Sequence, residues 1–210
     1  MKNWTNLFLQ EVLDKKRLKL LEKLIFFTEK WYYLAWWTAL ALQVWHRQSI
    51  DFDFFIQKNI NTDKLFKEIL NQFKNEKVIK TYEEKNTLYV EINWIKISFM
   101  TYDYDLLKPL TKTKHINIAS KIDIWCMKLW AIQNRATNKD YIDLYYILED
   151  YSIKKLINKF YIKYWNIVNE NLLLKSLIYF EDIKKEELIL NNKLSFEKVK
   201  KELIKKVSNY

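Results

Sequence analysis

Asp51 and Asp53 are the residues of this sequence whose types and spacing best suit chemistry. The stretch Ile50–Phe55 alternates apolar and acidic residues, which predicts a strand with both carboxylates on the same face. Two adjacent carboxylates repel unless a cation lies between them, and Mg²⁺ is commonly held by one or two carboxylates together with substrate phosphates. The pair therefore predicts a magnesium site for phosphoryl or nucleotidyl transfer. Two solvated acids on an edge strand are the alternative, which the apolar neighbours Phe52 and Phe54 disfavour.

A turn suited to holding phosphate precedes this strand. Residues 32–35 are typical of a short buried strand, and residues 37–46 of a helix. The free N–H groups that begin a helix, together with its dipole, bind phosphate. Glycine at positions 36 and 37 would let the backbone approach a phosphate closely, and Thr38 would add a hydroxyl group. The residues present are Trp36 and Trp37, whose indoles would instead fill this place as part of an aromatic core.

The sequence has no glycine among its 210 residues, yet it has nine tryptophans. At the usual frequency about 15 glycines are expected, and folds need them where the backbone takes positive φ or approaches a ligand closely. The codon UGA is read as tryptophan in some genetic codes and as glycine in others. We therefore expect glycine to belong at Trp36, Trp37, Trp45 and Trp94. Trp45 falls at a helix end, where glycine caps are common, and Trp94 follows Asn93 in a predicted hairpin, where Asn-Gly is favoured.

Composition excludes several classes of protein. Half of the residues are apolar and 30% are charged, which is typical of a globular chain and not of a disordered one. The single Cys126 excludes a disulfide framework and fits a cytoplasmic location. The apolar run Trp31–Trp45 spans 15 residues and is interrupted by Thr38 and Gln43, so no membrane span is expected. The net charge of +10 suits a polyanionic partner, although an AT-rich genome also enriches lysine.

Hydrophobic periodicity predicts strands mainly in the first half of the chain and helices in the second. The expected helices cover 6–27, 37–46, 63–73, 120–134, 138–150, 152–165, 170–180 and 193–206, and the expected strands cover 32–35, 50–55, 77–82, 86–92, 95–100 and 115–118. This order indicates an α+β fold, with a mixed sheet flanked by helices and an all-helical C-terminal half. We place the catalytic α/β half at residues 1–118 and a helical half that completes the site at residues 119–210.

Further candidate residues carry charge or a hydroxyl group. Lys128 lies in an otherwise apolar helical run, where a lysine needs a phosphate or an acid as partner unless it reaches solvent. Asp140 and Asp143 share a helix face. Asp143 lies among apolar residues and is the better functional candidate, whereas Asp140 could simply stabilise the first turn of its helix. Arg47 and Ser49, just before the acidic strand, could contact phosphate or pair with acids.

Residues 33–55 resemble the AbiEii/AbiGii toxin-type nucleotidyltransferases, within the DNA polymerase β-like nucleotidyltransferase superfamily. The resemblance continues in residues 93–99, 118–129 and 135–145, so it covers about residues 30–150 in order, and the helical tail shows no matching motif.

The resemblance assigns roles to the candidate residues. It implies that Asp51 and Asp53 bind Mg²⁺ and that residues 36–38 hold the triphosphate of an NTP. It also implies that Lys128 contacts phosphate and that Asp140 or Asp143 completes the site. The superfamily often adds a third carboxylate on a later strand, where this sequence has Ser98, with Glu91 as a weak substitute.

The function that the resemblance implies is transfer of a nucleotide from an NTP to an RNA acceptor, tRNA in some members. Many members are toxins that a separately encoded antitoxin protein neutralises, so NTP, RNA and an antitoxin are the expected partners. Two other functions stay open. The chain could be an inactive relative that binds RNA or an antitoxin, which real tryptophans at 36 and 37 would favour, or an enzyme that modifies protein hydroxyl groups.

Overall fold

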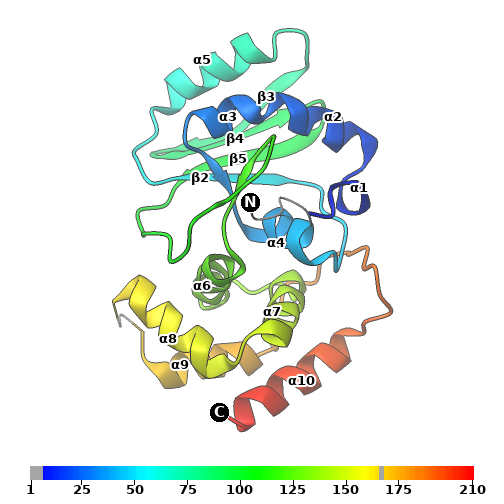
Figure 1. Ribbon diagram of the computed structural model, residues 1–210, viewed down its shortest axis with the longest axis vertical. Coiled ribbons are helices and arrows are strands. Elements are labelled where there is room, and N and C mark those ends of the chain that lie inside the picture. The colour runs from blue at the N-terminus through cyan, green and yellow to red at the C-terminus, as the bar shows by residue number, and fades with distance from the viewer. Residues whose placement is uncertain (1–6, 166–167) are drawn as a thin grey trace, which may run out of the picture.

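The computed structural model describes residues 7–165 and 168–210, and a mixed seven-stranded sheet forms its centre (Figure 1). The strands are β1 (Tyr33–Leu34), β2 (Phe52–Ile56), β3 (Val78–Glu84), β4 (Thr87–Ile92), β5 (Ile95–Thr101), β6 (Thr111–Lys112) and β7 (Asn117–Ile118), in the order β3-β4-β5-β2-β1-β7-β6. β2 runs parallel to β5 and antiparallel to β1. The acidic strand is therefore central, as its apolar flanks predict.

Helices flank the sheet, and the elements that follow β7 are helices. They are α1 (Leu9–Val12), α2 (Lys15–Lys23), α3 (Ile25–Glu29), α4 (Trp36–Val44), α5 (Thr62–Gln72), α6 (Lys121–Ile132), α7 (Asn138–Asp150), α8 (Ile153–Tyr164), α9 (Glu170–Ile178) and α10 (Phe196–Ser208). Helix α4 packs on β2, α6 and α7, and so joins the sheet to the helical half in Figure 1. The predicted α+β fold is confirmed. Within the described ranges, no helix is long and apolar enough to cross a bilayer.

The single helix expected over residues 6–27 is wrong, and residue 6 itself lies outside the described residues. Leu13 is extended, with φ −109° and ψ 136°, and ends α1. The side chain of Asp14 then accepts a hydrogen bond from the backbone N–H of Arg17 and begins α2. A capping aspartate competes with helix continuation, although the apolar periodicity runs on through it. A second break at Leu24 separates α2 from α3.

Smaller differences concern where elements begin. β2 starts at Phe52, so Asp51 immediately precedes the strand. Helix α10 starts later than predicted because Ser195 caps it by accepting from the N–H of Lys198. The short strand β6 was not predicted. The predicted hairpin between β4 and β5 is confirmed, and Asn93 and Trp94 at its turn have φ of 49° and 68°.

Aromatic packing fixes the central strands from one face of the sheet. The rings of Phe54 on β2 and Phe99 on β5 stack at 5.6 Å between centroids. Phe27 of α3 covers both, at 5.9 Å from Phe54 and 4.7 Å from Phe99. All three side chains are fully buried. Because side chains alternate along a strand, this packing directs Asp53 to the opposite face, toward α4 and the helical half.

Candidate active site

Asp51 and Asp53 lie together at the start of β2. Ser98 of β5 donates a hydrogen bond to Asp53 Oδ1 at 2.6 Å, whereas Asp53 Oδ2 is buried and has no partner among the described residues. Burial raises the pKa of Asp53 to about 6, the Ser98 hydrogen bond opposes the rise, and the charge of Asp51 adds to it. Burial also raises the pKa of the half-buried Asp51, and Lys96 opposes that rise. A buried, unsatisfied carboxylate oxygen beside a second carboxylate fits a divalent cation.

The cation would find two carboxylates here and not three. Ser98 lies directly opposite Asp53 in the β2–β5 register, at the position where the resemblance leads us to expect a third acid. Glu91 of β4 lies opposite Lys96 in the β4–β5 register, so Lys96 of β5 lies between Glu91 and the start of β2. In the part of the chain that the structure describes, no three His, Cys, Asp or Glu side chains are grouped to hold a metal. Substrate phosphates and water would supply the remaining ligands.

The turn into α4 lies beside this acid pair. Ala35, at the N-cap of α4, gives no side-chain cap, and the first helical residue, Trp36, has a φ of 58°. Thr38 Oγ1 lies 2.6 Å from Ser49 Oγ and donates to the carbonyl of Asp51. The hydroxyl groups of Thr38 and Ser49, both buried, therefore tie the first turn of α4 to the chain that leads into β2.

Trp37 stands between the acid pair and the helical half. Its indole Nε1 donates to Asp140 Oδ1 at 3.1 Å. The ammonium groups of Lys128 and Lys139 each lie 5.1 Å from its ring centroid. Two cations and one acid from α6 and α7 thus converge on a single indole at the N-terminus of α4.

Trp36 fills the adjacent space. Its ring packs edge-on against Phe55 at 5.1 Å and lies 5.7 Å from the guanidinium carbon of Arg135. The cavity that the two indoles line with Lys128, Arg135 and Asp140 has a volume of only about 10 Å³. On the other side of Trp37, a cavity of about 550 Å³ is lined by Asp51, Ser49 and Lys139. The indole of Trp37 therefore lines both cavities.

A buried ion-pair network lies behind the indoles. The carboxylate of Asp143 is fully buried and contacts His46 Nε2 at 2.5 Å, Arg47 Nε at 3.1 Å and Lys128 Nζ at 2.7 Å. Burial alone would raise the pKa of Asp143, but Arg47, Lys128 and His46 lower it below the ordinary range. Burial lowers the pKa of His46, and the hydrogen bond and charge of Asp143 oppose that effect. Lys128 also contacts Asp140 Oδ1 at 3.1 Å.

The network shows which partners several of the predicted site residues have. Lys128 is buried and paired with acids, which is one of the three alternatives that its apolar surroundings left open. Asp140 forms a capping box with Thr137, so it stabilises the first turn of α7 as well as holding Lys128. Asp143 is paired with Arg47 at the rear of the site. Asp143 also contacts Lys128, and so fixes the position of the Lys128 ammonium group beside Trp37.

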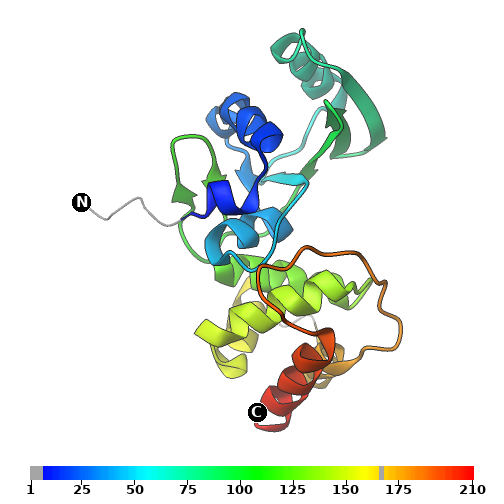
Figure 2. The same cartoon turned by 90° about the vertical axis from the view of Figure 1, so that its right-hand side faces the viewer.

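Other residues at the site were missed from the sequence. Lys139, Arg135 and Lys96 surround the acid pair and the indoles. All three lie within segments that carry the family resemblance, which was the available signal. Residues 186–189 also reach the site, but no signal in the sequence indicated this. They lie in the connection from α9 to α10, which passes α7 in Figure 2. Glu186 pairs with Lys139 at 2.5 Å, and the Ile189 carbonyl accepts from the N–H of Gln48 at 3.0 Å.

Comparison with protein families and relatives gives two matches in sequence. The model of the family described as nucleotidyl transferase AbiEii toxin, type IV toxin–antitoxin system, matches residues 38–207. The uncharacterized protein aq_aa25 of Aquifex aeolicus (strain VF5) is 36% identical over 157 residues, which are 70% of this chain and 73% of that protein. The family match extends through the helical tail, where no motif was recognised from the sequence.

Comparison with solved structures gives the same fold. MenT4, a nucleotidyltransferase toxin from Mycobacterium tuberculosis H37Rv, has a TM-score of 0.62 at 12% identity, over 96% of this chain and 86% of that one. A putative nucleotidyltransferase from H. pylori has a TM-score of 0.56 at 16% identity, over 94% of this chain and 95% of that one. At such low identities the likeness concerns the fold, which agrees with the α+β architecture described above.

The ion-pair network predicts a large stability effect at Asp143. Asp143→Ala leaves Arg47 buried without a counter-charge and Lys128 with Asp140 alone, so it should destabilise the protein by about 3–5 kcal/mol. Asp150→Ala removes the exposed partner of Lys121 and should cost about 0–1 kcal/mol. Urea unfolding of both variants measures the difference, and equal losses would contradict a buried network.

The raised pKa of Asp53 predicts a pH-dependent stability. The folded state holds this proton up to about pH 6 and the unfolded state only up to about pH 4. The stability that the protonated carboxyl gives is therefore full below pH 4 and is lost as pH rises through 6. In EDTA, the unfolding free energy of wild type relative to Asp53→Asn should fall by about 2–3 kcal/mol from pH 4 to pH 8. A constant difference would show that Asp53 is not buried as described.

Proposed function

Because the chain belongs to the AbiEii nucleotidyl transferase toxin family, we propose that it transfers a nucleotide from an NTP to an RNA acceptor, with tRNA as the first candidate. The reaction would depend on Mg²⁺ and take place in the cytoplasm, and a cognate antitoxin protein would restrain the enzyme. The observation that carries this proposal is the unpartnered buried oxygen of Asp53 beside Asp51, which faces a cluster of cations.

The residues of the chain divide the work of the reaction. When bound at Asp51 and Asp53, Mg²⁺ would neutralise charge on the triphosphate and align the reacting oxygens. Lys128, Lys139 and Arg135 would place positive charge against the triphosphate at the N-terminus of α4, where backbone N–H groups are also free to bind it. A hydroxyl oxygen of the acceptor would bond to the α-phosphorus and lose its proton, and the bond to pyrophosphate would break.

Asp143 acts through other residues in this proposal. Its carboxylate is fully buried in contact with Lys128, Arg47 and His46, so it positions Lys128 and does not itself reach a substrate. Asp140, which Lys128 and the Trp37 indole both contact, lies nearer to the proposed triphosphate. The prediction that Asp143 is catalytic thus becomes a proposal that it is a positioning residue.

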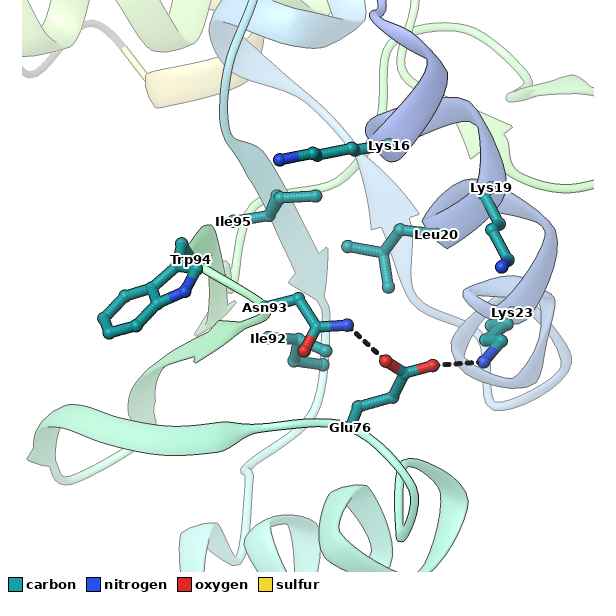
Figure 3. Close-up of a pocket in the computed structure, with 9 residues that line it drawn as sticks. All are labelled: Lys16, Lys19, Leu20, Lys23, Glu76, Ile92, Asn93, Trp94 and Ile95. Atoms are coloured by element: carbon teal, nitrogen blue, oxygen red, sulfur yellow. Dashed lines mark hydrogen bonds and ion pairs between the residues drawn. The ribbon is translucent and has the colours of Figure 1, made fainter.

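A lysine-lined pocket beside α2 supports RNA as the acceptor. Figure 3 shows Lys16, Lys19 and Lys23 of α2 on one side of a cavity of about 400 Å³, and residues 92–95 of the β4–β5 hairpin line its other side. Lys23 is paired with Glu76. Arg17 Nε donates to the carbonyl of Ile50 at 2.8 Å, so the start of α2 lies next to the chain that leads to Asp51.

The pocket and the acid pair are connected by further positive charge. Lys96 follows Ile95, which lines the pocket, and acts electrostatically on Asp51. A row of lysines that leads to a metal-binding acid pair suits the phosphate backbone of a nucleic acid strand. The net charge of +10 agrees with such a partner.

The two indoles at the N-terminus of α4 favour one rival function. With only about 10 Å³ left between Trp36, Trp37 and the cations, a triphosphate has no room there. A chain with these indoles would be an inactive relative that binds RNA or an antitoxin without turnover. Nucleotide binding by the protein with and without the indoles separates the two functions.

Label transfer tests the proposed reaction. The protein with Trp36→Gly and Trp37→Gly, incubated with each α-labelled NTP, Mg²⁺ and total RNA, should label RNA. Adding Asp53→Asn to this protein should lower the rate at least about 100-fold, because the cation loses a ligand that offsets transition-state charge. No label on RNA with any NTP would contradict the proposal, and label on added proteins would redirect it to protein acceptors.

Charge reversal tests the lysine-lined pocket. Lys16→Glu with Lys19→Glu should weaken RNA binding at least about tenfold at low salt and reduce the salt dependence of the affinity, because two phosphate contacts are lost. Lys154→Glu with Lys155→Glu on α8 makes the same change in net charge away from the pocket and should have little effect. Fluorescence anisotropy with labelled tRNA measures both. Equal losses would assign the effect to net charge alone.

A further inference from the structure

Backbone conformation singles out particular tryptophans. Within residues 7–165 and 168–210, seven residues have positive φ. Glycine adopts this conformation most readily, but the chain has no glycine. Two are Asn86 and Asn93, and asparagine is the side chain that tolerates the left-handed region best. The other five are all tryptophans: Trp31, Trp36, Trp45, Trp94 and Trp165. A bulky residue with positive φ is a genuine outlier, so five of one type point to a common cause.

Three of these tryptophans occupy positions where protein chains use glycine for known reasons. Trp45 and Trp165 are the left-handed C-caps of α4 and α8, with φ of 55° and 51°. Glycine is the usual residue at such a cap. Trp94 follows Asn93 in the β4–β5 turn, where two consecutive positive φ values favour Asn-Gly.

At three of the five positions the side chain does little for the fold. Trp31, Trp94 and Trp165 are 78%, 69% and 71% exposed. Figure 3 shows the indole of Trp94 directed away from α2, and its ring lies 4.0 Å from the ammonium group of Lys77 on the surface. Trp125, in contrast, is fully buried within α6, where the backbone is helical. The unusual backbone therefore coincides with indoles that few contacts require.

Position 36 links the pattern to the proposed active site. Trp36 has a φ of 58° at the first residue of α4, and its indole and that of Trp37 occupy the space in front of Lys128, Arg135 and Asp140. Lys128, which is also paired with Asp140 and Asp143, and Arg135 both direct positive charge at these indoles.

We propose that positions 31, 36, 37, 45, 94 and 165 carry glycine in the protein as its own cell makes it. The evidence for positions 31, 36, 45, 94 and 165 is their positive φ. The evidence for position 37 is that its indole helps to fill the cavity in front of Lys128. A codon read as glycine in that cell and as tryptophan under another genetic code accounts for all six at once.

Glycine at positions 36 and 37 would join two cavities beside the acid pair. That a triphosphate occupies the joined space rests on the proposed function. Without the Trp37 indole, the cavity of about 550 Å³ beside Asp51 would join the space in front of Lys128 and Asp140. The backbone at the start of α4 would then be bare toward both, so a triphosphate could lie between the cations and the acid pair.

Peptide mass spectrometry of the protein purified from the cells that encode it tests the proposal directly. Tryptic cleavage after Lys30 and Arg47 releases residues 31–47, which contain positions 31, 36, 37 and 45 in one peptide. Residues 86–96 and 164–175 report positions 94 and 165. Each peptide should be lighter by the tryptophan–glycine mass difference at every one of these positions. Tryptophan at the positive-φ positions would overturn the proposal, whatever activity the protein has.

A pair of matched variants tests the backbone argument. Trp45→Gly and Trp45→Ala remove the same indole and its stacking on Phe8, and they differ only in how readily they adopt positive φ. The glycine variant should melt about 2–4 °C above the alanine variant. An equal or higher melting temperature for the alanine variant would contradict the backbone argument.

Nucleotide binding tests the consequence for the site. The protein with Trp36→Gly and Trp37→Gly should bind Mg²⁺–NTP at least about tenfold more tightly than the protein with both tryptophans. Glycine in the peptides without such a gain would uphold the proposed residues and refute the proposed nucleotide site. Tryptophan in the peptides together with tight nucleotide binding would do the reverse.

Discussion

The arrangement of the site depends on one ammonium group, that of Lys128, held between two carboxylates of α7. Its contacts of 2.7 Å to Asp143 and 3.1 Å to Asp140 bind α6 to α7, and Asp143 extends the link to His46 and Arg47 at the end of α4. All of these groups are buried. Breaking such a network leaves charges that the interior cannot solvate, so the helical half is held in register with the sheet. The proposed active site lies on the boundary that this network fixes.

The opposite signs of charge on the two sides of that boundary suit a metal-bound polyphosphate. The sheet contributes Asp51 and Asp53, whose pKa values are raised by burial. The helical half contributes Lys128, Lys139 and Arg135, whose charges converge on the N-terminus of α4. A cation on the first side and phosphates on the second would satisfy both groups at once. The indoles of the chain now separate them, which is why the identity of positions 36 and 37 matters for function.

Local features of this structure could be predicted from the sequence, and features that depend on distant contacts could not. The acidic pair, the Asn93–Trp94 turn and the left-handed cap at Trp45 follow from residue type and spacing over a few positions. The prediction of one long first helix was wrong because the sequence alone does not distinguish Asp14 from an ordinary exposed polar residue. In the structure its side chain caps α2. Residues 186–189 reach the site through a long connection that leaves no periodic signal.

We propose that Asp51 and Asp53 hold a cation, which faces an anion site made by the backbone of residues 36–38 when positions 36 and 37 are glycine. The most direct measurement is a crystal structure of the protein with Trp36→Gly and Trp37→Gly, grown with Mn²⁺ in place of Mg²⁺ and a non-hydrolysable NTP. We expect an anomalous Mn²⁺ peak between the carboxylates of Asp51 and Asp53, with the triphosphate against residues 36–38 and near Lys128. Manganese bound elsewhere, or a triphosphate away from α4, would contradict it.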